Sequence, residues 1–109
     1  MKKFFQILIT LISVSAFLLV HAENEIDPMN LPGLAEYVTD FTNVLGADDI
    51  QSLRQIARDY ETKTTNQMVV VLIPTRSGNE LFDIGMKIFN GNKIGQKGKN
   101  NGILLVIAT

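Results

Sequence analysis

Two stretches of the chain repeat apolar residues at steps of three and four, which is the period of an amphipathic helix. The first covers residues 47–64 and the second covers residues 80–89. Asp48 and Asp49 fall in the first turn of the earlier helix, where negative charge suits the helix dipole. This stabilising role accounts for both residues without a catalytic one. The apolar stripes consist of Ile50, Leu53, Ile56, Ala57 and Tyr60 in the first helix, and of Leu81, Ile84, Gly85, Ile88 and Phe89 in the second.

Two further stretches are nearly continuous apolar runs of strand length. Residues 67–73 are rich in β-branched side chains and end at Pro74, and residues 103–108 form the second run. Runs of this kind are typical of strands that are covered on both faces. The order helix, strand, helix, strand predicts an α/β fold, with a small mixed or parallel sheet between helices and with the two strands paired in parallel.

A short segment, residues 38–46, precedes the first helix and contains apolar residues that are able to dock on a core, such as Val38 and Phe41. Asp40 sits among them with polar neighbours. An Asp in this setting holds a turn by accepting hydrogen bonds from backbone amides two residues on. The same carboxylate is also a candidate ligand, and the local sequence favours the turn.

The first 22 residues have the layout of a secretory signal peptide. Lys2 and Lys3 precede a mostly apolar run over residues 4–20, and small residues follow at the position where a signal peptidase cuts. The alternative is an uncleaved membrane anchor, although the run is at the lower length limit for spanning a bilayer. Residues 23–36 then form an extended, proline-containing lead-in. We therefore expect an exported protein that is periplasmic or associated with the envelope.

The composition excludes several kinds of chemistry. The 109 residues contain no cysteine, which removes thiolate nucleophiles, thiolate metal sites and disulfides. The single histidine, His21, lies in the predicted signal peptide, so the mature chain has no imidazole for catalysis or metal binding. The 10 basic and 11 acidic residues give a net charge of −1, which offers no basic face to nucleic acid.

The least ordinary stretch is the loop of residues 93–102, which is rich in glycine and lysine and directly precedes the second strand. It lacks the spacing of a Walker-type phosphate loop and the alternating carboxylates of a helix-loop-helix calcium site. A backbone anion site and a simple turn at Asn101-Gly102 are the two alternatives. The loop begins at the opposite end of the sheet from Asp40, so Asp40 and Asn100 cannot share a ligand if the loop stays at that end.

Residues 37–108 resemble the TPM domain family of thylakoid-lumen and exported bacterial proteins. The resemblance rests on Val38-Thr39-Asp40, on Glu61 and Asn66-Gln67-Met68-Val69-Val70-Val71, and above all on Ile94-Gly95-Gln96-Lys97-Gly98-Lys99-Asn100-Asn101-Gly102-Ile103-Leu104-Leu105. It implies an α/β sandwich. It also implies acid phosphatase activity, as in some plant members, or calcium binding, as in some bacterial members. The metal ligands that it implies by position are Asp40, Asn100 and Asn101.

The chain departs from the family pattern in two ways. Asn100 stands where the family usually has Asp, which leaves an oxygen for calcium but removes a general base. The resemblance also covers only the amino-terminal portion of the family's domain, in residues 37–109. We therefore expect a fold that is truncated after the second strand, with an open sheet edge and marginal stability.

Taken together, the sequence predicts an exported TPM-domain protein of the bacterial cell envelope that acts as a non-enzymatic binding or scaffold module, with calcium as a candidate ligand. The alternative is a phosphatase-like hydrolase, which the resemblance implies and which the truncation would inactivate. The expected partner is a protein of the envelope, and no nucleic acid is expected. Contact with the membrane is expected only through residues 1–22, if they are not cleaved.

Overall fold

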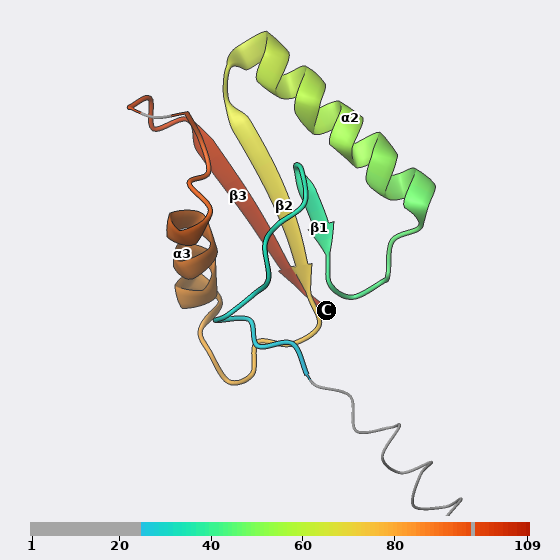
Figure 1. The fold of residues 1–109 in the computed structure, drawn as a ribbon, viewed down its shortest axis with the longest axis vertical. Coiled ribbons are helices and arrows are strands. Elements are labelled where there is room, and N and C mark those ends of the chain that lie inside the picture. The colour runs from blue at the N-terminus through green and yellow to red at the C-terminus, as the bar shows by residue number, and fades with distance from the viewer. Residues whose placement is uncertain (1–24, 97) are drawn as a thin grey trace, which may run out of the picture.

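The computed structural model describes residues 25–96 and 98–109, so the predicted signal peptide lies outside the described residues. Five elements follow one another along this part of the chain (Figure 1). They are β1 (Val38–Asp40), α2 (Ala47–Thr64), β2 (Gln67–Ile73), α3 (Leu81–Gly91) and β3 (Gly102–Ala108). Within these residues, no helix has the length and hydropathy that a membrane crossing requires.

The three strands form one parallel sheet in the order β1-β2-β3. β2 and β3 pair from Gln67 opposite Gly102 to Ile73 opposite Ala108, which confirms the predicted pairing and the α/β class. β1 is a strand that the sequence pattern does not predict, so β3 is the third strand of the sheet and not the second. Its three residues are too few to display a period of two, and pairing with β2 fixes it.

The predicted helices are present. α2 covers residues 47–64, as predicted, and ends at Thr65, a left-handed residue whose N–H donates to the carbonyl of Glu61 (2.8 Å). α3 begins one residue later and ends two residues later than predicted, because Asn90 and Gly91 still belong to its last turn.

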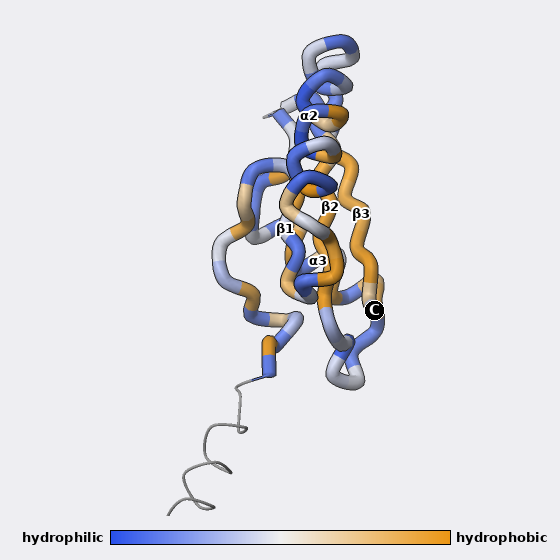
Figure 2. The backbone as a smooth tube through the Cα atoms, turned by 90° about the vertical axis from the view of Figure 1, so that its right-hand side faces the viewer, coloured by the Kyte–Doolittle hydropathy of each residue, from blue (hydrophilic) through white to orange (hydrophobic). Residues whose placement is uncertain are grey.

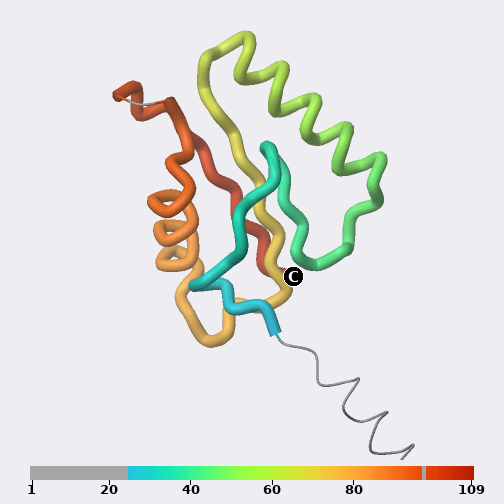
Figure 3. The backbone as a smooth tube through the Cα atoms, viewed as in Figure 1, coloured from blue at the N-terminus to red at the C-terminus, as the bar shows by residue number. Residues whose placement is uncertain are grey.

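The two helices cover opposite faces of the sheet (Figure 1). On one face, Ile84 and Ile88 of α3 pack on β2, and the lead-in lies beside them (Figure 3). On the other face, α2 packs on β1 and β2 with Ala57 buried at the contact. Both connections, β1 to β2 and β2 to β3, step one strand in the same direction across the sheet, but their helices lie on opposite faces. The two crossovers therefore differ in hand, and one of them departs from the usual right-handed rule.

β3 lies at a free edge of the sheet and is covered on one face only. Leu104 and Val106 are partly buried on the face that α3 covers. The alternate side chains on the opposite face are Ile103, Leu105 and Ile107, which are 43%, 50% and 39% exposed. The prediction that both long strands are covered on both faces is therefore wrong for β3, because α2 contacts β1 and β2 but does not reach β3. Figure 2 shows β3 as a hydrophobic strand, in contrast to the mostly hydrophilic α2.

Candidate functional site

Asp40 ends β1 at the carboxyl end of the sheet and holds the turn that leads to α2. Its Oδ1 accepts hydrogen bonds from the N–H of Thr42 (2.8 Å) and from the Thr42 hydroxyl. Its Oδ2 accepts one from the N–H of Leu45 (2.9 Å). Both carboxylate oxygens are thus engaged within the turn, which is the arrangement that the local sequence favours.

These bonds also set the charge of the Asp40 carboxyl. Burial by itself raises its pKa. The hydroxyl of Thr42 and the N–H groups of Leu45, Thr42 and Val44 outweigh burial, so the pKa lies below its ordinary value of 3.8. Asp40 is therefore a stable anion at neutral pH, which suits a structural acceptor better than a group that transfers protons.

We expect Asp40→Asn to lower the free energy of unfolding by about 1 kcal/mol at pH 7, because an amide cannot accept every bond that the carboxylate accepts. A carboxyl whose folded-state pKa is lowered stabilises the fold above its unfolded pKa, and that stability is lost as the pH falls through the folded value. The difference between wild type and variant should therefore shrink below about pH 4. Urea unfolding at neutral and acid pH measures this difference, with Glu25→Gln as an exposed control. A difference that is independent of pH would contradict the role of the carboxylate.

At the amino end of the sheet, Asn101 joins three segments of the chain. Its Oδ1 accepts a hydrogen bond from the N–H of Gln96 (2.7 Å), and its Nδ2 donates one to the carbonyl of Thr65 (2.5 Å). The carbonyl of Asn101 accepts a bond from the N–H of Gln67 (2.9 Å). The loop before β3 is thereby tied to the exit of α2 and to the start of β2. We call these four residues the amino-end clamp.

Two glycines close the loop onto the clamp. The N–H of Gly95 donates to Oε1 of Gln67 (2.6 Å), which leaves this N–H unavailable to a bound anion. A Cβ built on Gly102 would stand 2.6 Å from the carbonyl oxygen of Ile94, and a Cβ on Gly95 would stand 2.8 Å from the nitrogen of Gly102. Because real Cβ atoms do not approach backbone this closely, both positions need glycine. Gly95 and Gly102 therefore serve the packing of the chain on itself.

The three residues predicted as metal ligands do not lie together. Asp40 lies at the carboxyl end of β1, whereas Asn101 directly precedes β3 at the amino end. Along β2 this is the separation from Gln67 to Leu72, about 17 Å at the usual rise of a strand. One calcium ion therefore cannot bind both Asp40 and the pair Asn100-Asn101. In the part of the chain that the structure describes, no group of three His, Asp or Glu side chains is placed to hold a metal ion.

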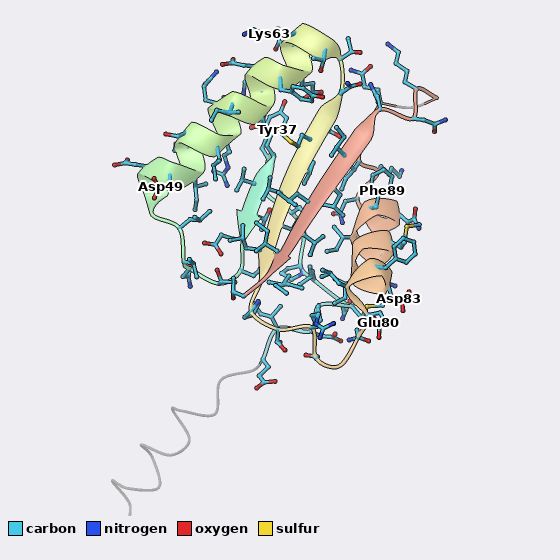
Figure 4. The ribbon with its side chains drawn as sticks, turned by 180° about the vertical axis from the view of Figure 1, so that it is seen from behind. Tyr37, Asp49, Lys63, Glu80, Asp83 and Phe89 are labelled. Carbon is cyan, nitrogen blue, oxygen red and sulfur yellow. The ribbon has the colours of Figure 1, made fainter. Side chains whose placement is uncertain are left out.

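A second polar group at the amino end centres on Tyr37, just before β1, and the sequence pattern does not reveal it. The Tyr37 hydroxyl donates to Oε2 of Glu61 (2.6 Å), and the guanidinium carbon of Arg58 lies 5.7 Å from the centre of the tyrosine ring. Arg58 also pairs with Glu36 at 3.6 Å. Arg58 and Glu61 are three residues apart on α2 and therefore share one face of it. Figure 4 shows Tyr37 between the sheet and α2, so the group holds the lead-in to that helix.

The surroundings of Tyr37 keep its hydroxyl protonated. The hydrogen bond to Glu61 raises the pKa of Tyr37 above its ordinary value of 10.0, and burial and the charges of Glu61 and Glu36 add to the effect, while Arg58 opposes it. Tyr37 also has a φ of 63°, which is unusual for a bulky residue. The hydrogen bonds on either side hold it in that conformation, so its hydroxyl acts here as a structural donor.

A polar cavity of about 280 Å³ lies beside Tyr37, between the lead-in, β2 and the end of α3. Its polar lining consists of Glu36, Tyr37, Gln67, Asn92 and Lys93. The volume is slightly below the range of about 300–1,000 Å³ that is usual for small-molecule sites. Because Gln67 and Tyr37 already bond within the fold, the cavity suits water or a small polar molecule.

Comparison with known proteins gives a family match. The family model described as TPM domain matches residues 38–109, which include all five elements of the fold. The matched region contains both the Asp40 turn and the amino-end clamp. No curated protein matches the chain significantly.

Proposed function

The chain belongs to the TPM domain family, and on that premise we propose that it is an exported protein of the bacterial cell envelope that acts as a non-enzymatic binding or scaffold module. The observation that carries this proposal is the use that the fold makes of the polar residues at both ends of the sheet. Asp40, Gln67 and Asn101 all bond to backbone groups of the chain itself. Side chains that are engaged in this way fix loops and are poorly suited to proton transfer.

The proposed location rests on the sequence of residues 1–22, with its basic start, apolar run and small residues at the end. Cleavage after this segment would release the domain into the periplasm, and retention would anchor it at the membrane surface. In both cases the domain faces the envelope, where we propose that its partner is a protein.

Exposed apolar side chains support a binding role. Phe82 and Met86 of α3 are 77% and 43% exposed, and both line one apolar groove with Leu105 of β3, which is 50% exposed. Soluble monomers rarely leave large contiguous apolar patches uncovered, and such patches mark interaction sites. A protein partner would remove these side chains from water and gain the hydrophobic free energy of their burial.

We propose at most a weak calcium site, near Asn100 and Asn101. The ion takes about six to eight oxygen ligands. Since Asp40 lies at the other end of the sheet, the ligands near Asn100 and Asn101 would be amide and backbone oxygens, completed by water. Such a site would be weak, and its effect would be to stiffen the loop.

Hydrolysis of p-nitrophenyl phosphate tests the proposal against a phosphatase. We expect the purified chain and an Asn100→Asp variant to be equally inactive, with and without calcium, because Asp40 lies at the other end of the sheet and the described residues contain no group of three His, Asp or Glu side chains placed to hold a metal ion. Asn100→Gly is the matched control, since it changes the same position without adding a charge. Calcium-dependent hydrolysis that appears in Asn100→Asp and not in Asn100→Gly would sink the proposal and favour the hydrolase.

A further inference from the structure

The polar cavity beside Tyr37 brings together hydrogen-bonding groups from three segments that are far apart in sequence. These segments are the lead-in, the start of β2 and the exit of α3. The base of the cavity is fixed, because Leu34 and Ile94 line it and also pack on the core around Val69. A preformed hollow in which a few polar groups converge is the usual setting for a small ligand.

Gln67 lines this cavity with an amide of which the fold uses one half. Its Oε1 accepts the bond from the N–H of Gly95 (2.6 Å), which fixes the orientation of the side chain. Its Nε2 has no hydrogen-bond partner among residues 25–96 and 98–109, and solvent reaches this nitrogen. The amide therefore keeps two N–H donors for a molecule in the cavity.

Asn92 lines the same cavity and is arranged in the opposite sense. Its Nδ2 donates to the carbonyl of Ile88 (2.8 Å), and no donor in the described part of the chain bonds to its Oδ1. The fold thus holds one end of each amide and leaves a donor at Gln67 and an acceptor at Asn92. A ligand that matches both carries an acceptor and a donor close together.

The charges around the cavity favour an anion. Lys93 lines it, and no carboxylate of the described residues lies within ion-pair distance of this lysine. Glu36 also lines it, but the guanidinium of Arg58 lies 3.6 Å from its carboxylate and offsets the negative charge. One positive charge remains, so a carboxylate is the acceptor that fits best, and an added ammonium group would meet repulsion.

We propose that this cavity binds a small carboxylate that carries a hydroxyl group on the neighbouring carbon. Lys93 and Nε2 of Gln67 bind the carboxylate, and Oδ1 of Asn92 accepts a hydrogen bond from the hydroxyl. The volume of about 280 Å³ suits a molecule of a few carbon atoms. The inference goes beyond the binding role proposed above, because the ligand is a small molecule and the cavity shares no residue with the apolar groove of α3 and β3.

Titration with lactate, followed by amide chemical shifts at constant ionic strength, tests the proposal on the chain as an exporting host produces it. We expect saturable shifts at Glu36, Gln67 and Lys93, and none at Thr42 or Leu45, which lie at the other end of the sheet. Propionate lacks only the hydroxyl group and should bind about fivefold more weakly, since one hydrogen bond is lost. Propylene glycol lacks the carboxylate and should not bind.

Variants at two positions separate binding from folding. Gln67→Glu keeps an acceptor for the N–H of Gly95 but replaces the donor by a second, charged oxygen, so lactate binding should be lost. Lys93→Gln removes the positive charge and should weaken binding about tenfold. Lys99→Gln is the matched control and should leave binding unchanged, because Lys99 is an exposed lysine of the same loop that does not line the cavity. Unchanged amide shifts in the Asp40 turn verify that each variant is folded.

Three results would overturn the proposal. The first is a wild-type chain without saturable shifts in lactate, and the second is a lactate affinity that is equal in Lys93→Gln and Lys99→Gln. The third is propionate or propylene glycol that binds as tightly as lactate, because the site would then not recognise the hydroxyl group or the carboxylate. None of these results bears on the hydrolysis of p-nitrophenyl phosphate that tests the proposed function, so the two proposals fail separately.

Discussion

Gly102→Ala is expected to lower the free energy of unfolding by about 3 kcal/mol and to release the start of β3 from β2. The new Cβ would stand 2.6 Å from the carbonyl oxygen of Ile94 and 2.8 Å from the carbonyl carbon. Both are backbone atoms that cannot rotate away as a flexible side chain would. Either the amino-end clamp opens or β3 shifts against β2, and each change costs packing and hydrogen bonds. Urea unfolding followed by circular dichroism measures the loss.

Two further variants test whether the close backbone contact causes this loss of stability. Gly95→Ala should be destabilising to a similar degree, because its Cβ would meet the same contact from the other side at a φ of +96°. Gly33→Ala is the matched control, because a Cβ there meets nothing within 4 Å. If Gly102→Ala were as stable as Gly33→Ala, the close approach of the loop to β3 would be refuted.

Asn101→Ala is expected to lower the free energy of unfolding by about 2 kcal/mol, because the N–H of Gln96 and the carbonyl of Thr65 lose their partner. Asn101→Asp separates the two bonds. It keeps an acceptor for Gln96 but sets a second acceptor against Thr65, so it should be nearly as destabilising at neutral pH. At acid pH a protonated carboxyl regains a donor, and the loss should become smaller.

Asn100→Gly is the control for this series. Asn100 is exposed and has a φ of 49°, which glycine adopts without strain, so we expect almost no change in stability. The measurement is again urea unfolding, together with amide exchange in the loop before β3. A loss in Asn101→Ala that is no larger than in Asn100→Gly would contradict the clamp.

The long elements of the fold follow from the sequence because each displays its own period. α2 carries a stripe at helical spacing, and β2 and β3 are apolar runs of strand length. β1 cannot be recognised in this way, because its three residues become a strand only through pairing with β2 and through the bond that Arg54 donates to the carbonyl of Val38 (3.0 Å). The sequence does not reveal that one face of β3 is uncovered, for a related reason. An apolar run looks the same whether or not the chain supplies a neighbour to cover it.

In the candidate site, too, contacts between residues close in sequence can be predicted and contacts between distant residues cannot. The Asp40 turn can be predicted because its partners, Thr42 and Leu45, lie within the next five residues. The amino-end clamp cannot, since Asn101 bonds to Thr65 at a separation of 36 residues. In the sequence, Asn101-Gly102 looks like a simple turn, and only the fold shows that the asparagine links three segments. The Tyr37–Glu61 bond spans 24 residues and is hidden for the same reason.

The all-parallel arrangement of the three strands also bears on how this chain reaches its native state. Each pairing joins residues about 30 positions apart or more, such as Val38 with Val70 and Gln67 with Gly102, so no neighbouring strands can zip together from a tight hairpin. Contacts between such distant residues form late, because long stretches of chain must first be brought together. We therefore expect a newly made polypeptide of this design to stay extended longer than one built from hairpins. If the chain is exported, as we propose, slow closure of the sheet would leave it unfolded while it crosses a membrane.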